Sequence, residues 1–147
     1  DIITQHTDSP APLQVAENRG VKGFGQASDM IKFAPKAQLS AIVNNWGAYY
    51  VERTKAMMNG SWKSQDVWYG LKEGMVEMAP YTNMSSDAAA LAKKTEEAIR
   101  SGDLHPFTGP IKDQSGKLVV EAGKIADAGM LLGMNFYVEG VQGSLPK

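Results

Sequence analysis

Residues 1–43 read DIITQHTDSPAPLQVAENRGVKGFGQASDMIKFAPKAQLSAIV, and three short apolar segments in this stretch decide the fold. Ile2–Gln5, Val21–Phe24 and Gln38–Val43 are rich in apolar and β-branched residues, and each predicts a buried strand. Between the first two, a polar Thr-Asp-Ser segment followed by proline predicts a helix that runs to about Arg19. Strands that alternate with helices predict an α/β fold, a mostly parallel sheet flanked by helices with right-handed crossovers.

The remainder of the chain predicts further helices, strands and one hairpin. Two helices are expected, at Ala48–Met58 and Ala88–Ser101, because each segment ends at Asn-Gly or Gly. Ser64–Tyr69 and Met75–Met78 are expected to be short strands. The turn sequence Asp-Gln-Ser-Gly predicts a hairpin between 110–111 and 117–120, and a last helical stretch is expected at about 125–134.

The spacing of apolar residues predicts which side of each helix is buried. In the first helix these are Leu13, Val15 and Ala16, and in the second Tyr49, Val51, Ala56 and Met57. In the third they are Leu91, Ala92, Ala98 and Ile99.

Composition narrows the range of functions. The chain has 147 residues, which fits one domain, and its net charge of −1 gives no basic surplus for a nucleic-acid partner. It has no cysteine, which excludes thiolate catalysis, disulfides and cysteine-based zinc sites. Its two histidines lie about a hundred residues apart without ligand spacing, so we expect no metal site.

Polar residues follow each of the three predicted strands. In open α/β sheets, ligands bind beyond the carboxyl ends of the strands, which meet at one edge. Amide and carboxylate groups supply directional donors and acceptors there, and an indole supplies a stacking face. The sequence therefore predicts a site for a small, flat, polar ligand, formed by His6, Asp8, Gln26, Asp29, Asn44 and Trp46.

Each of these residues also has a purely structural interpretation. Asp8 and Asp29 are placed to cap helical turns, His6 suits a sheet edge, and Trp46 suits a core. An enzyme that uses His6 and Asp8 as an acid–base pair is a further alternative. However, no supported nucleophile is evident, and the glycines near Phe24 depart from the dinucleotide fingerprint, so we expect no catalytic residue and no cofactor.

Five segments in order resemble one protein family, the basic-membrane-protein family of ABC transporter substrate-binding lipoproteins, which includes purine nucleoside receptors. The opening DIITQHTDSPAPLQVAENRGVKGFGQASDM and the segment LSAIVNNWGAYYVERTKAMMNGSW are similar to its strand–helix units. The segments WYGLKEGMVEMAPY, FTGPIKDQSGKLVV and NFYVEGVQGSLP resemble its later motifs. The resemblance covers nearly the whole chain.

The resemblance implies a type I periplasmic-binding fold with two lobes and a ligand held between them. Residues 1–147 would be the C-terminal half, and an N-terminal lobe would be absent; a chain that opens on a strand without methionine agrees with a piece of a longer protein. The implied role is to deliver a small molecule to an ABC permease, as a periplasmic protein or as a lipoprotein anchored outside the inner membrane. A ligand-sensing regulatory domain on the same fold is the alternative.

The family's nucleoside-binding members also imply which ligand to expect. Ala27 stands where many of them have aspartate, and Asn44 where they often have lysine. Trp46 is larger than the residue usual there and would fill ribose space. These departures favour a free purine base, adenine or hypoxanthine, over a nucleoside.

Overall fold

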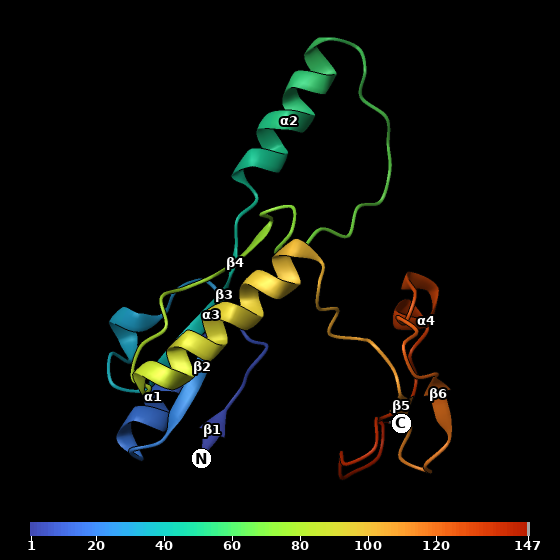
Figure 1. Cartoon of the computed structure of the whole chain (residues 1–147). Coiled ribbons are helices and arrows are strands. Elements are labelled where there is room, and N and C mark those ends of the chain that lie inside the picture. The colour runs from blue at the N-terminus through green and yellow to red at the C-terminus, as the bar shows by residue number, and fades with distance from the viewer. Residues whose placement is uncertain (147) are drawn as a thin grey trace. The chain divides into compact units, whose positions relative to one another are not determined.

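The computed structural model describes residues 1–146, and the chain divides into two compact units, Asp1–Gly102 and Asp103–Lys147 (Figure 1). The first unit contains a four-stranded sheet, and the second contains a two-stranded hairpin. None of the helices within residues 1–146 combines the length and the apolar character that a bilayer crossing requires.

The sheet of the first unit has the order β1-β2-β3-β4, with bounds Ile2–Ile3, Lys22–Ala27, Gln38–Asn44 and Val76–Met78. The first three strands are parallel and β4 is antiparallel to β3, so the prediction of a mostly parallel α/β sheet is confirmed. β2 runs three residues past the predicted end at Phe24, because Gly25, Gln26 and Ala27 pair with β3. The loop expected at Gly25 and Gln26 is therefore strand.

Helix α1, Ala11–Asn18, covers one face of the sheet. Leu13 and Ala16 are buried against Met30, Ala34 and Ala37, which belong to the crossover from β2 to β3. The fit is close, since a Cβ on Gly23 would lie 2.8 Å from Cδ2 of Leu13. The prediction that Val15 faces inward was wrong, because its side chain is exposed.

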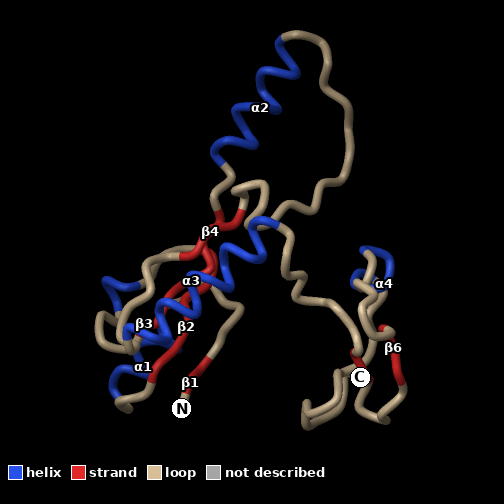
Figure 2. The backbone as a smooth tube through the Cα atoms, viewed as in Figure 1, coloured by secondary structure: helices blue, strands red, loops and turns tan. Residues whose placement is uncertain are grey.

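Helix α2, Gly47–Met58, follows β3, and the chain then runs without regular structure to the turn at 71–74 (Figure 2). The strand predicted at Ser64–Tyr69 was wrong. A strand needs a partner, and β4 already pairs with the edge of β3 that was open to it. Val51 and Met57 of α2 are exposed, so their predicted burial was also wrong.

Helix α3, Ser86–Ser101, begins at the N-cap Ser85, whose hydroxyl accepts a hydrogen bond from the Ala88 amide. It ends at Gly102, whose φ of 88° is the left-handed conformation that glycine adopts readily. Glu96 accepts hydrogen bonds from the Tyr81 hydroxyl and from the Arg100 guanidinium. Leu91, which the spacing predicted to be buried, is exposed.

The second unit is built on the predicted hairpin, β5 (Ile111–Lys112) paired with β6 (Leu118–Val120). One carboxylate oxygen of Asp113 accepts hydrogen bonds from the Ser115 amide and hydroxyl and from the Lys117 amide. The Ser115 hydroxyl, followed by these amides, lowers the pKa of Asp113. Helix α4 is only Ala128–Leu132, shorter than predicted.

Candidate functional site

The candidate site lies at the edge of the sheet where the three parallel strands end. β1, β2 and β3 point the same way, and so the segments that follow them start at one edge. Because β4 is antiparallel, its first residue, Val76, pairs with Asn44 at the same edge. Four segments of the chain therefore meet where the sequence predicted a ligand.

The loop after β1 is tied to the loop after β2 by one polar residue. Nε2 of Gln5 donates to the sulfur of Met30 at 3.6 Å, and Oε1 of Gln5 accepts from the Thr7 hydroxyl at 3.1 Å. His6 and Asp8 are exposed, and within residues 1–146 their side chains make no hydrogen bond. The capping interpretation of Asp8 finds no support, because the N-cap residue of α1 is Pro10 and has no side-chain cap.

The last residue of β2, Ala27, has a strained backbone conformation. Ala27 has a φ of 65°, a conformation that costs a residue with a side chain roughly 1–2 kcal/mol. The neighbouring Gln26 is half-buried. In the described part of the chain its side-chain amide has no hydrogen-bond partner. Strained residues are enriched at functional sites, and this one lies between two predicted strand-end positions, Gln26 and Asp29.

Asp29 turns away from the edge. Its Oδ1 accepts from the Ile31 amide at 3.0 Å and from Nε2 of Gln38 at 2.6 Å. Gln38 is buried, begins β3, and uses its Oε1 to accept from the Met30 amide at 3.0 Å. This carboxylate therefore links the β2–β3 crossover to the first residue of β3. That end of β3 is remote from the candidate site.

The segment after β3 combines two amides with aromatic rings. Nδ2 of Asn45 donates to the Gly74 carbonyl at 3.1 Å and to Glu77 at 2.8 Å, which fixes the start of β4 against the end of β3. Asn44 is exposed, and its side chain makes no hydrogen bond within residues 1–146. Trp46 is 44% exposed, with Tyr50 edge-on at a centroid distance of 6.2 Å, so it is not a core residue of this chain.

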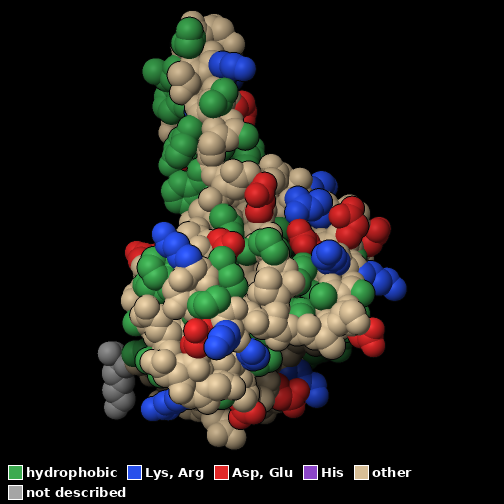
Figure 3. Space-filling view, turned by 90° about the vertical axis from the view of Figure 1, so that its left-hand side faces the viewer, with side chains coloured by type: hydrophobic (Ala, Val, Ile, Leu, Met, Phe, Trp, Pro, Cys, Tyr) green, Lys and Arg blue, Asp and Glu red, His purple; other side chains and the backbone are tan. Residues whose placement is uncertain are grey.

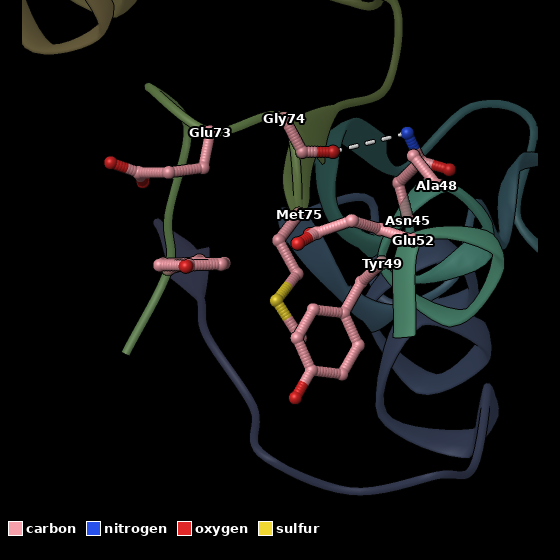
Figure 4. A pocket seen from close by; sticks show the side chains of 8 residues that line it. Asn45, Ala48, Tyr49, Glu52, Glu73, Gly74 and Met75 are labelled. Atoms are coloured by element: carbon pink, nitrogen blue, oxygen red, sulfur yellow. Dashed lines mark hydrogen bonds between the residues drawn. The ribbon is translucent and has the colours of Figure 1, made fainter. Parts of the chain in front are cut away.

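A cavity of about 410 Å³ opens beside this segment, between α2 and residues 69–75 (Figure 4). Glu52 and Glu73 come from its opposite walls, and the rings of Tyr49 and Tyr69 meet edge-on at 6.2 Å. The remaining lining residues are Asn45, Ala48, Gly74 and Met75. Rings and carboxylates of this kind can stack on a flat molecule and accept its N–H donors.

Sequence reasoning missed this cavity, since none of the six predicted site residues lines it. Tyr49 was assigned to the core, and Tyr69 to a strand that does not form. The sequence signal for this region is the Tyr-Gly-Leu-Lys segment at 69–72, which belongs to one of the motifs that resemble the family. Arg53 lies over the Tyr49 ring at 5.4 Å, and its hydrogen bond to Glu52 raises the Arg53 pKa.

The structure thus places five of the six predicted residues at the strand-end edge, and it directs Asp29 elsewhere. No hydrogen bond joins any two of the six within residues 1–146. Their role in ligand binding stays a prediction. Among the described residues, no three His, Asp or Glu side chains converge where they could hold a metal ion.

Comparisons with known proteins show what this chain is similar to. A protein-family model described as ABC transporter substrate-binding protein PnrA-like matches residues 1–104. A purine-binding protein of Brucella abortus (strain 2308) is 61% identical over 147 residues, which are 100% of this chain and 42% of that protein. A putative ABC transporter glucose-binding protein of Haloferax volcanii is 26% identical, over 99% of this chain and 35% of that protein. The chain therefore spans less than half the length of these curated relatives.

A solved structure agrees on the fold. A transcriptional activator of the comK gene from Bacillus halodurans superposes with a TM-score of 0.61 at 16% sequence identity. The match covers 72% of this chain and 38% of that one. At this identity the likeness supports the α/β lobe and carries no information on the ligand.

Proposed function

This chain belongs to the Bmp family of PnrA-like ABC transporter substrate-binding proteins, and from that membership we propose that it forms one lobe of a two-lobe receptor for a small solute. The ligand is a purine, held between the strand-end edge of this lobe and a second lobe. The receptor works outside the cytoplasmic membrane and delivers its ligand to an ABC permease. Its role is binding and not catalysis.

One observation carries the proposal: polar side chains gather at the strand-end edge without partners of their own. His6, Asp8, Gln26 and Asn44 make no side-chain hydrogen bond within residues 1–146. A purine presents donors and acceptors around its edge and two apolar faces. Unpaired amides and a carboxylate suit the edge, and the half-exposed Trp46 indole suits a face.

The mechanism we propose is closure on the ligand. Each lobe supplies part of the contacts, so the ligand favours the closed state by the difference between its affinities for the closed and open states. Closure removes water from the faces of the base while its polar edge is paired. The closed shape is then the one that the permease recognises.

Among purines, we propose a free base, adenine or hypoxanthine. Support comes from the relative in Brucella abortus, which is named as purine-binding, and from residues at the edge. Ala27 and Asn44 offer no charged group for a ribose, and Trp46 occupies space beside them. The relative named as glucose-binding makes a sugar the competing ligand class.

Isothermal titration of the full-length protein with adenine, hypoxanthine, adenosine, inosine and glucose tests this proposal. We expect the bases to bind more tightly than the nucleosides, and glucose not to bind. Tighter nucleoside binding would contradict the preference for a base, and glucose binding alone would contradict a purine receptor.

The substitution Trp46→Ala tests the stacking face. Loss of base–aromatic stacking should weaken binding by about 1–3 kcal/mol, roughly 5- to 150-fold in Kd. Trp62→Ala is the matched control, because Trp62 is 45% exposed and lies beyond the end of α2. Unchanged purine affinity in Trp46→Ala, with a lower melting temperature, would assign the indole to packing instead.

A further inference from the structure

Helix α2 leaves a large apolar surface uncovered. None of its residues is buried, and Figure 1 shows it extending beyond the end of the sheet and not lying across it. Five large apolar side chains of the helix and its N-cap are between 44% and 83% exposed: Trp46, Tyr50, Val51, Met57 and Met58. An exposed apolar surface of this extent is typical of an interaction site.

These five side chains lie on one side of the helix. At 3.6 residues per turn they fall within an arc of about 140°, which runs from Trp46 to Val51. The other members of the arc, Gly47 and Thr54, carry no charge. Figure 3 shows the hydrophobic side chains gathered along the part of the molecule that α2 forms at the top of the view. We call this surface the α2 arc.

The charged residues of the helix lie outside the α2 arc, and the chain already covers part of that other side. Glu52, Arg53 and Lys55 fall there, by the same helical spacing. Tyr49 falls there too, and its ring meets Tyr69 edge-on. Among the described residues, the side of the helix that stays uncovered is therefore the uncharged one.

We propose that the α2 arc is the contact surface for the other lobe of the full-length protein, which meets it with an apolar surface poor in charge. This inference rests on the two-lobe organisation proposed above. The relative that is 61% identical has more than half of its length outside the matched part, enough for a second lobe. The α2 arc also begins at Trp46, so it continues the strand-end edge on which that lobe would close.

Photo-crosslinking in the full-length protein tests this assignment. p-Benzoylphenylalanine replaces Val51 or Met58 in the α2 arc, or the exposed Lys94 of α3 as a control. After irradiation, peptide mapping by mass spectrometry identifies the crosslinked segment. We expect Val51 and Met58 to crosslink to peptides outside residues 1–147, with yields at least tenfold above that from Lys94.

Three other outcomes would overturn the inference. Crosslinks from Val51 and Met58 into residues 1–102 would mean that α2 packs on its own sheet. Crosslinks between two molecules would make the α2 arc a self-association surface. Yields equal to that from Lys94 would mean that the α2 arc faces water.

Purine titration of the same samples separates this inference from the proposed function. Retained purine binding without a crosslink outside residues 1–147 would overturn only the inference on the α2 arc. The expected crosslinks without purine binding would overturn only the ligand assignment. Thermal unfolding of each variant confirms that it is folded.

Discussion

Replacing Gln38 with glutamate should destabilise the first unit, because it sets two carboxylates against each other. Gln38 is 1% exposed, and its Nε2 donates to Oδ1 of Asp29 at 2.6 Å. Losing a hydrogen bond to a charged group costs about 1.5–3 kcal/mol, and the added repulsion between like charges raises the expected loss to about 2–4 kcal/mol at pH 7. Gln38→Glu still offers an oxygen to the Met30 amide, so the loss reports on the Asp29 contact.

The loss of stability in Gln38→Glu should depend on pH. Two touching carboxylates share a proton, so one of them has a raised pKa in the folded variant. The destabilisation is then absent below the unfolded value, near pH 4, and is complete above the raised folded value. Urea unfolding at pH 4 and pH 7 should therefore show a smaller loss at the lower pH.

Two further variants test the reasoning. Gln38→Met keeps the length but removes the acceptor of the buried Met30 amide, and should cost about 1–3 kcal/mol at either pH. Asp29→Asn in the Gln38→Glu background restores a donor and should recover about 1–2 kcal/mol at pH 7. A Gln38→Glu protein within about 0.5 kcal/mol of the parent at pH 7, without pH dependence, would refute the account of how the crossover is held.

Four more expectations follow from packing, protonation, strain and ligand binding. Leu13→Ala should lower the free energy of unfolding by about 2–5 kcal/mol, against less than about 1 kcal/mol for the exposed Val15→Ala, both measured in urea. Burial, followed by the charge of Glu96 and the hydrogen bond to it, raises the Tyr81 pKa to about 12, so the stabilisation from Tyr81 is present below pH 10 and fades towards 12. Ultraviolet titration should show that Tyr81→Phe removes a phenolate step near 12; loss of a step near 10 would contradict this. Ala27→Val should destabilise by about 1–2 kcal/mol while Ala27→Gly is neutral or stabilising, and equal effects would remove the strain argument. Chain 1–147 alone should bind adenine poorly by titration, and a submicromolar Kd would contradict a two-lobe site.

Local patterns account for what the sequence predicted well. Proline, glycine and the spacing of apolar residues predicted where α1 and the parallel strands lie. These signals act within a few residues of the chain. The errors came from contacts across the chain. β2 extends to Ala27 because β3 pairs with it, and Ser64–Tyr69 stays irregular because β4 already occupies the strand edge. Periodicity predicted burial for Val51 and Met57 without identifying what would cover them.

In the candidate site, too, local sequence signals were informative and contacts across the chain were not predictable. Position in the chain was enough to place His6, Gln26 and Asn44 at strand ends. The partner of Asp29 was not predictable, because Gln38 is nine residues away across a crossover whose geometry no local signal gives. Tyr69 was missed for a similar reason, since an irregular segment brings it to the cavity.

Two of the three strand-end segments pair a polar residue whose side chain is hydrogen-bonded with a neighbour whose side chain is not. Gln5 bonds to Met30 while His6 has no partner, and Asn45 bonds to Gly74 while Asn44 has none within residues 1–146. After β2, the Gln26 side chain has no hydrogen-bond partner within residues 1–146, and the bonded Asp29 reaches the start of β3, away from this edge.

The bonded residue fixes the backbone, so the unbonded neighbour is presented in a set direction at little further entropic cost when a ligand binds. A surface that was polar only for solubility would not need the bonded members after β1 and β3. We propose that this pairing preorganises the edge for a ligand.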